Sequence, residues 1–446
     1  MQVEPGIFKA YDIRGVYPAQ LDEQVARAVG QAFVTFLEVE EVVVGRDMRL
    51  SGPGMHGALI GGLTEQGADV IDIGMVSTDQ YYYACATLER PGIMVTASHN
   101  PPAYNGFKFS GPGASAVGSD SGLFEIRDAV LADPQIPDEQ TGGLEEVDLI
   151  GAYREQVLQF VRGLRPLKVA IDACNGMDGK MVPAIFGELP IEIRKLNFTH
   201  DGRFAHDPNP MKAENTADLQ AMVREGGVDF GACFDGDADR CVLIDETGER
   251  IPSDLITALL ATEALRAEPG AAIVYDLRSS RAVREAIVAG GGVPIRERVG
   301  HAFMKAALKK HNAVLGGELS GHYYFRENGF ADSGMILFAM MLTVLSATEK
   351  RISELVAPLE KYHATGELNF RVSDKTAAMG QVTEHFADGE VDELDGVTVQ
   401  FNDWWLNLRP SNTEPLLRLN LEADTAALRD AKLAEVTALL GEPGAQ

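Results

Sequence analysis

Short apolar runs alternate with amphipathic stretches along most of the chain, and this alternation predicts an α/β fold. The apolar run 41–44 predicts a buried strand, the pattern over 55–65 predicts a helix, and 68–73 predicts a second strand. Further strands or helices are expected in two later segments, at 167–172, 228–234, 254–265 and 271–275. Repeated strand–helix–strand units are typical of largely parallel sheets that are covered by helices.

The pattern changes near the C-terminus, where a different kind of domain is expected. The last ~80 residues have shorter β-like runs and a final Ala/Leu-rich helix from about Thr425. The length of 446 residues alone suggests roughly three domains. We therefore predict three similar α/β domains with mixed, largely parallel sheets and a smaller C-terminal α+β domain around a central cleft, with bounds at 1–143, 144–249, 250–363 and 364–446.

Composition excludes two classes of partner. The chain carries 39 Lys and Arg against 66 Asp and Glu, a net charge of −27 that repels nucleic acids and anionic membranes. No stretch approaches the ~20 apolar residues of a membrane span, and the start lacks the basic and apolar regions of a secretory signal. The four cysteines have no metal or redox spacing, so we expect reduced thiols in a cytoplasmic protein.

The most informative stretch is the serine loop, residues 96–101, because it follows an apolar run at 92–95. Ligands of α/β sheets bind at strand ends, so Ser98 is placed where a phosphoryl group could be held. Lys108 can return to the same place and suits a phosphate. The loop has no G-x-S-x-G pattern, and adjacent Ser and His side chains are expected to diverge, which disfavours a hydrolase. An ordinary polar loop is the alternative.

A second loop, the aspartate loop 235–240, places Asp235, Asp237 and Asp239 at alternate positions. Three carboxylates without His or Cys favour Mg²⁺ over zinc. An EF-hand would place Glu246 correctly but needs glycine where Arg240 stands, so it is rejected. A solvated acidic turn is the other alternative, although three like charges this close repel strongly without a counterion.

Two further loops carry groups suited to a phosphorylated sugar. In the sugar loop, residues 316–322, Glu318 and Ser320 offer the acceptor and donor that sugar hydroxyls need, and His322 can act as acid or base. The phosphate loop, residues 409–415, combines groups that bind a phosphate monoester: Arg409, Ser411, Asn412 and Thr413. The alternatives are a glycine-rich turn for the first loop and a capping turn for the second.

Together these stretches resemble the α-D-phosphohexomutase family, most closely its phosphomannomutase/phosphoglucomutase branch. The matching segments run from 8–15 to 409–415 in the family's order and span nearly the whole chain. The resemblance implies a four-domain, heart-shaped fold, a phosphoserine at Ser98, and acid/base candidates at Lys108 and His322. It implies Mg²⁺ on the three aspartates, sugar recognition by the sugar loop, and distal phosphate binding by the phosphate loop. Four more residues are implied to line the cleft: Tyr11, Arg14, Arg240 and His301.

The implied reaction moves phosphate between O1 and O6 of a hexose, mannose or glucose. Phospho-Ser98 would donate to the free hydroxyl, so that hexose 1,6-bisphosphate is both intermediate and activator. A glucosamine-phosphate mutase is an alternative of the same class, because similar sugar loops occur in enzymes acting on that sugar. A non-catalytic phosphosugar-binding protein would have no use for Ser98, Lys108 and the aspartate loop together.

Overall fold

The first domain is a mixed sheet with helices on both faces. The structure is a computed structural model that describes residues 3–119, 121–132, 141–411 and 416–444. The sheet order is β1 (Ile13–Val16), β5 (Tyr104–Gly111), β4 (Gly92–Val95), β2 (Glu41–Arg46), β3 (Asp69–Met75) and β7 (Leu144–Glu146), with β6 (Ser115–Ala116) beside β5. Its helices are α1 (Glu23–Leu37), α2 (Gly52–Glu65), α3 (Thr78–Leu88) and α4 (Leu123–Leu131).

Strand β2 shows why this sheet is covered on both faces. Val42 and Val44 pack into a core with α1, α2 and α4, whereas Val43 between them packs into a second core with α3. Side chains alternate across a strand, so a continuous apolar run requires a cover on each side. The run therefore predicts a central strand of an α/β sheet, which the structure confirms.

Over the described residues, the second domain has a four-stranded sheet and three helices. The strand order is β11 (Cys241–Ile244), β10 (Phe230–Phe234), β8 (Leu167–Asp172) and β9 (Ile191–Leu196), and the helices are α5 (Ile150–Leu158), α6 (Asp178–Phe186) and α7 (Ala217–Arg224).

The third domain has a five-stranded sheet. The strand order is β13 (Val293–Glu297), β12 (Ala272–Asp276), β14 (Leu315–Gly317), β15 (Tyr323–Phe325) and β16 (Ala331–Asp332), and the helices are α8 (Ser253–Ala267), α9 (Arg281–Ala289), α10 (His301–His311), α11 (Gly334–Ser346) and α12 (Ile352–Val356). In both sheets parallel strands are extended by antiparallel ones.

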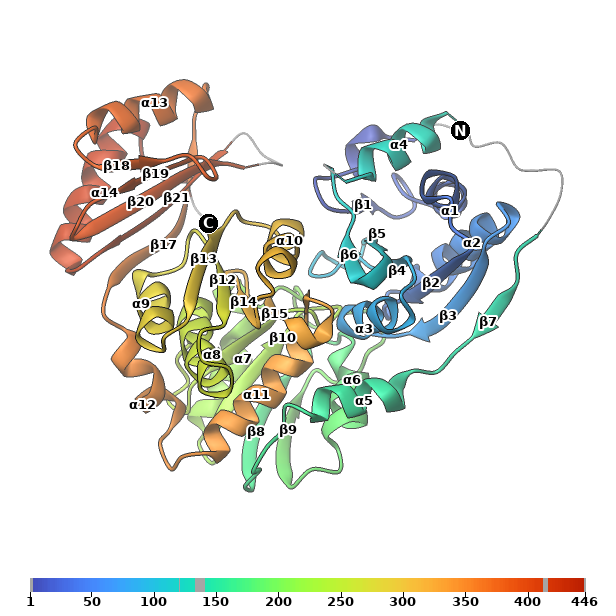
Figure 1. Ribbon diagram of the computed structural model, residues 1–446, viewed down its shortest axis with the longest axis horizontal. Helices are drawn as coiled ribbons and strands as arrows, with labels where there is room; N and C mark the ends of the chain where they lie inside the picture. Colours follow the sequence, from blue (N-terminus) through green and yellow to red (C-terminus); the bar gives the residue numbers. More distant parts are fainter. Residues whose placement is uncertain (1–2, 120, 133–140, 412–415, 445–446) are drawn as a thin grey trace.

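The C-terminal domain is an antiparallel sheet with two helices. Its order is β17 (His363–Arg371), β21 (Leu416–Ala423), β20 (Trp404–Pro410), β19 (Val397–Gln400) and β18 (Glu390–Asp392), and its helices are α13 (Lys375–His385) and α14 (Ala426–Leu440). Figure 1 shows this domain and the first domain standing apart, at the upper left and the right, with the second and third domains below them. The predicted α+β character is confirmed.

One hydrophobic core runs through the second and third domains. Phe338 of α11 lies with its ring centroid 4.9 Å from that of Phe186 in α6 and 5.8 Å from that of Phe230 in β10. The first and C-terminal domains have cores of their own. The second and third domains are therefore joined by packing as well as by the chain.

The predicted fold class is confirmed, but the first sheet extends beyond the domain boundary that we expected. Strand β7 pairs in parallel with β3, so the first sheet continues three residues past the expected boundary at 143. This edge strand is exposed and has no apolar run that would mark it. Within the described ranges, no helix combines the length and apolar character that crossing a lipid bilayer requires.

Candidate active site

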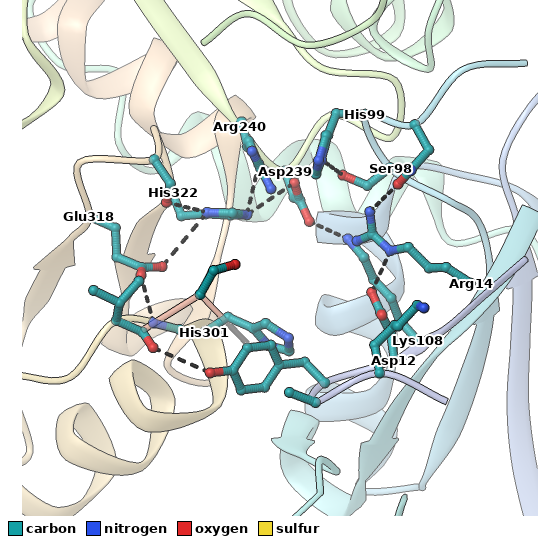
Figure 2. A pocket seen from close by; sticks show the side chains of 18 of the residues that line it. Asp12, Arg14, Ser98, His99, Lys108, Asp239, Arg240, His301, Glu318 and His322 are labelled. Atoms are coloured by element: carbon teal, nitrogen blue, oxygen red, sulfur yellow. Dashed lines mark hydrogen bonds and ion pairs between the residues drawn. The ribbon is translucent and has the colours of Figure 1, made fainter. Parts of the chain in front are cut away.

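The loops at the strand ends of all four domains meet at one cavity of about 720 Å³. Figure 2 shows side chains of the first domain facing those of the third across it, with Arg240 and Asp239 between them. Twelve of the residues predicted from the sequence line this cavity: Tyr11, Arg14, Ser98, Lys108, Asp239, Arg240, His301, Glu318, Ser320, His322, Arg409 and Ser411. Asp235 and Asp237 are fully buried next to it. Asn412 and Thr413 lie outside the described residues.

Ser98 is held in an unusual backbone conformation at the end of β4. Its φ of 49° is in the left-handed region, and its side chain is buried. The hydroxyl donates to Asp235 Oδ2 at 2.8 Å, so the serine loop and the aspartate loop touch through this pair. Ser98 Oγ also lies 3.2 Å from His99 Nδ1, and the expectation that these adjacent side chains diverge is wrong. The left-handed turn brings both to one side of the chain.

Arg49, which the sequence analysis did not single out, fixes the shape of the serine loop. Its side chain is fully buried and all five of its N–H groups are used. They donate, at 2.7 to 3.1 Å, to Asp47 Oδ2 and to the backbone oxygens of Ser98, Asn100, Pro101 and Tyr104. This bonding supports the strained conformation at Ser98.

The pairing of β4 with β5 places Lys108 at the aspartate loop. Lys108 lies opposite Met94, and its ammonium donates to Asp237 Oδ2 at 2.8 Å and also to Asp239. Burial opposes the charge, but Asp237 and Asp239 outweigh it and raise the pKa of Lys108 above its usual range. The lysine is therefore a cation that lies against two carboxylates and faces the cavity.

The aspartate loop joins β10 to β11, and it approaches the serine loop closely. A Cβ at Gly236 would lie 2.5 Å from the backbone oxygen of Ser98, so only glycine fits there. The carboxylates of Asp235, Asp237 and Asp239 are buried and place one oxygen each within 4.8 Å of the others.

These three carboxylates fit a hard cation. Asp237 Oδ1 and Asp239 Oδ1 are buried, and neither has a hydrogen-bond partner among the residues that the structure describes. Burial raises the pKa of Asp235, and the charges of Asp239 and Asp237 add to the effect. Burial also disfavours a charged Asp239, but Lys108 and His322 outweigh it and hold the pKa of that carboxyl well below its usual range. Oxygen ligands of this kind could bind a metal ion.

The sugar loop joins β14 to β15 and reaches the aspartate loop. Glu318 accepts a hydrogen bond from the backbone N–H of Gly300 at 3.0 Å, which fixes its carboxylate at the cavity. Ser320 Oγ lies 2.9 Å from His322 Nδ1, and His322 Nε2 lies 3.4 Å from Asp239 Oδ1. His322 therefore connects the sugar loop with the aspartate loop, as the dashed lines in Figure 2 show.

Two aromatic side chains from different domains meet at the wall of the cavity. The rings of Tyr11 and His301 pack edge to face with centroids 5.3 Å apart, and the Tyr11 hydroxyl donates to the backbone oxygen of Val299 at 3.3 Å. Burial lowers the pKa of His301 well below its usual range, and the charge of Lys305 adds to this. His301 is therefore a neutral imidazole at the first residue of α10.

The other two predicted wall residues are arginines held by acidic or imidazole partners. Arg14 Nε donates to Asp12 Oδ2 at 2.7 Å, and its Nη1 donates to Asn100 in the serine loop. Arg240 Nε lies 3.3 Å from His322 Nε2. Both guanidiniums line the cavity and add positive charge to a wall that also carries carboxylates.

Comparison with known proteins identifies the family. The chain matches all four domains described for phosphoglucomutase/phosphomannomutase: α/β/α domain I over residues 5–135, domain II over 151–248, domain III over 252–362 and the C-terminal domain over 367–439. The chain belongs to the phosphoglucomutase/phosphomannomutase family.

Proteins of this family are similar to the chain over nearly its full length. A protein named phosphohexose mutases from Xanthomonas campestris pv. campestris is 41% identical over 441 residues, which is 97% of this chain and 98% of that protein. A phosphomannomutase of Escherichia coli is 38% identical over 98% of this chain and 99% of that protein. A crystal structure of a phosphoglucomutase/phosphomannomutase family protein from Burkholderia thailandensis superposes with a TM-score of 0.90 at 34% identity, over 98% of each chain. The predicted enzyme class, a phosphohexomutase, is confirmed.

For this phosphohexomutase, sequence reasoning missed two arginines that line the cavity beside Arg409, namely Arg278 and Arg418. Arg278 follows the end of β12, as Ser98 follows β4, so the rule that ligands bind at strand ends was the available signal. Arg418 lies within β21 and is paired with Arg409 across the sheet. Nothing in its immediate sequence indicates a binding role.

Proposed function

We propose that the protein interconverts hexose 1-phosphate and hexose 6-phosphate, with mannose or glucose as the sugar, through a phosphoserine at residue 98. The observation that carries this proposal is the contact between Ser98 Oγ and Asp235 Oδ2 at 2.8 Å, inside a cavity also lined by the sugar loop and Arg409. A nucleophilic hydroxyl, a cluster of carboxylates and separate groups for sugar and phosphate are what a phosphoryl relay needs.

In the proposed reaction a phosphoryl group moves from one oxygen atom to another. The bond between phosphorus and Ser98 Oγ breaks while a bond forms from phosphorus to the oxygen of the free sugar hydroxyl. The proton of that hydroxyl passes to a base of the cavity, and the departing Ser98 Oγ takes up a proton, so that the serine hydroxyl is regenerated. The product, hexose 1,6-bisphosphate, then turns around in the cavity and returns its other phosphate to Ser98. The bisphosphate is thus the intermediate, and added bisphosphate activates enzyme that has lost its serine phosphate.

Lys108 and His322 are the candidates for acting on the sugar hydroxyl, Lys108 as a fixed cation and His322 as the group that moves the proton. Both line the cavity and both contact Asp239. The raised pKa of Lys108 suits a group that keeps its proton and stabilises negative charge. His322 is held by Ser320 and Arg240, so its ring is oriented before the substrate arrives.

We propose Mg²⁺ as the metal, with Asp235, Asp237 and Asp239 as its ligands. Asp237 Oδ1 and Asp239 Oδ1 are buried and accept no hydrogen bond within the described chain, which fits an oxygen-preferring cation. A bound Mg²⁺ neutralises negative charge on a transferring phosphoryl group.

We also propose a reducing compartment, the cytoplasm, as the location of the protein. All four cysteines are free and buried, and Cys174 Sγ lies 3.6 Å from Cys233 Sγ, within hydrogen-bond distance for sulfur and without a disulfide between them. Such a thiol pair is typical of proteins that are kept reduced.

The experiment that tests the function is a mutase assay with mannose, glucose and glucosamine 1-phosphates, each with a catalytic amount of the matching bisphosphate. We expect turnover of mannose 1-phosphate or glucose 1-phosphate. Turnover of glucosamine 1-phosphate alone would favour the alternative mutase, and no turnover of any of the three would contradict the proposal.

A pair of substitutions separates phosphate binding from sugar recognition. Arg409→Ala should lower kcat/KM for mannose and glucose 1-phosphates alike, by about tenfold or more, because a charge-assisted contact to their shared phosphate is lost. Glu318→Gln should affect the two sugars unequally, because it changes hydrogen bonds to ring hydroxyls whose configuration differs. Steady-state kinetics of both variants on both sugars is the measurement. A shift of sugar preference in Arg409→Ala but not in Glu318→Gln would show that these roles are assigned wrongly.

A further inference from the structure

Three arginines from two domains come together at one end of the cavity. Arg278 follows β12 of the third domain, whereas Arg409 and Arg418 belong to β20 and β21 of the C-terminal domain. Arg278 and Arg409 are more than nine-tenths buried. Guanidinium groups this close repel one another, and the charge of Arg278, after burial, contributes to lowering the pKa of Arg409. Something must hold these like charges in place.

Glu367 of β17 contacts all three guanidiniums. Its Oε2 lies 2.7 Å from Arg409 Nη2 and 3.4 Å from Arg278 Nη1, and its Oε1 lies 3.3 Å from Arg418 Nη1. Burial disfavours its charge, but Arg278, Arg409 and Arg418 outweigh burial and lower the pKa of Glu367. The carboxylate is therefore ionised at neutral pH and bound by three cations.

Glu367 holds these arginines from behind. Over the described residues, the cavity is lined by all three arginines but not by Glu367. Arg409 Nε and Arg418 Nε are buried and, within the described ranges, make no hydrogen bond. Asp276 holds Arg278 from another side, with Nη2 to Oδ2 at 2.7 Å. Arg409 and Arg418 thus line the cavity while each keeps an Nε–H group that no described residue accepts.

We propose that Glu367 is a positioning residue that gathers arginines of the third and C-terminal domains into one subsite for the distal phosphate of the substrate. The proposal rests on the proposed function, because it concerns the phosphate of that substrate. Glu367 itself does not touch the phosphate. It lowers the repulsion between the three cations and fixes the C-terminal domain relative to Arg278, so that the phosphate meets an arrangement formed in advance.

The opposite role, a carboxylate that competes with the phosphate for the arginines, makes the opposite prediction. Removal of a competitor would tighten phosphate binding, whereas removal of a positioning residue weakens it. The position of Glu367 outside the cavity lining favours positioning. The experiment decides between these two roles.

The test is calorimetric binding of inorganic phosphate to the full-length protein, which does not depend on mutase activity. The binding event that Arg409→Ala removes identifies the arginine subsite. In Glu367→Gln, which keeps the shape and removes the charge, we expect this event to weaken about tenfold or more. In kinetics, KM for hexose 1-phosphate should rise while kcat changes less than about threefold, because the reacting groups at Ser98 are untouched.

A matched control removes a different ion pair between the same two domains. Asp424 accepts a hydrogen bond from Arg281 Nη2 at 2.6 Å, and neither residue is among those that line the cavity. Asp424→Asn should leave both phosphate affinity and KM unchanged. Glu367→Asp, which keeps the charge on a shorter side chain, should fall between wild type and Glu367→Gln. It also serves as the test variant if Glu367→Gln does not fold.

Each outcome bears on the proposal. Unchanged or tighter phosphate binding in Glu367→Gln would overturn it, as would an equal loss in Asp424→Asn, since the effect would then be one of general domain docking. A wild-type protein that binds phosphate at this subsite but turns over no hexose phosphate would contradict the proposed function and leave the role of Glu367 supported.

Discussion

Replacement of Ser98 by alanine should lower mutase turnover by roughly a thousandfold or more, because the relay loses the atom that carries the phosphoryl group. The Ser98 hydroxyl contacts Asp235 at 2.8 Å at the cavity, whereas the other hydroxyl of the serine loop, Thr96 Oγ1, does not line the cavity and donates to Asp47 and Asp237. The intact mass of the purified wild-type protein should include a fraction that is heavier by one phosphate. Ser98→Ala should lack this fraction.

Ser115 provides a matched control for this experiment. It lies in β6, outside the cavity, and its hydroxyl donates to the backbone oxygen of Pro112. Ser115→Ala should keep both the activity and the heavier fraction. Near-normal turnover of Ser98→Ala, with its fold verified by circular dichroism, would exclude a phosphoserine relay at this position.

Much of this site can be predicted from the sequence, because its residues follow apolar runs in short clusters. Asp235, Asp237 and Asp239 come directly after β10, and the connection between β10 and β11 keeps them in one loop. Glu318 and His322 lie in the same way between β14 and β15. Since strand ends of α/β domains are where ligands bind, the local pattern already indicates the place and the chemistry.

The rest of the site depends on contacts that have no local pattern. Arg278 and Arg418 acquire their role only because both converge on Glu367, from separate strands. Arg49 binds backbone oxygens, which any sequence provides, so no residue type in the serine loop indicates its partner. The contact of Ser98 with His99 follows from a left-handed φ at a non-glycine residue, a conformation that sequence rules do not predict there.

Asp237→Asn is expected to have the second-largest effect, a fall in kcat of about a hundredfold or more together with a higher requirement for Mg²⁺. Asp237 is fully buried and also accepts hydrogen bonds from Lys108 at 2.8 Å and from Thr78 at 2.6 Å. The substitution removes a charge from the carboxylate cluster and leaves the Lys108 ammonium with fewer anions around it. Activity measured across a series of Mg²⁺ concentrations, with a chelator as the zero point, tests this.

Asp245 gives the comparison for this measurement, because it lies in the turn after β11 and caps that turn by accepting from Thr247 N at 2.9 Å. Asp245→Asn should keep the wild-type dependence on Mg²⁺. If the wild-type protein stayed fully active under strong chelation, the aspartate loop would be a structural element, and its interpretation as a metal site would be wrong.

The core shared by the second and third domains also determines which parts of the chain can melt separately. Phe338 of α11 fills space against Phe186 and Phe230, so a fragment ending near residue 249 would expose the apolar faces of α6 and β10 to water. The C-terminal domain has a separate core, and it meets the third domain through β17 and through ion pairs such as Glu367 with Arg278 and Asp424 with Arg281. The second and third domains should therefore unfold together as one cooperative unit on heating. The two domains together are then the smallest part of this central region that folds independently.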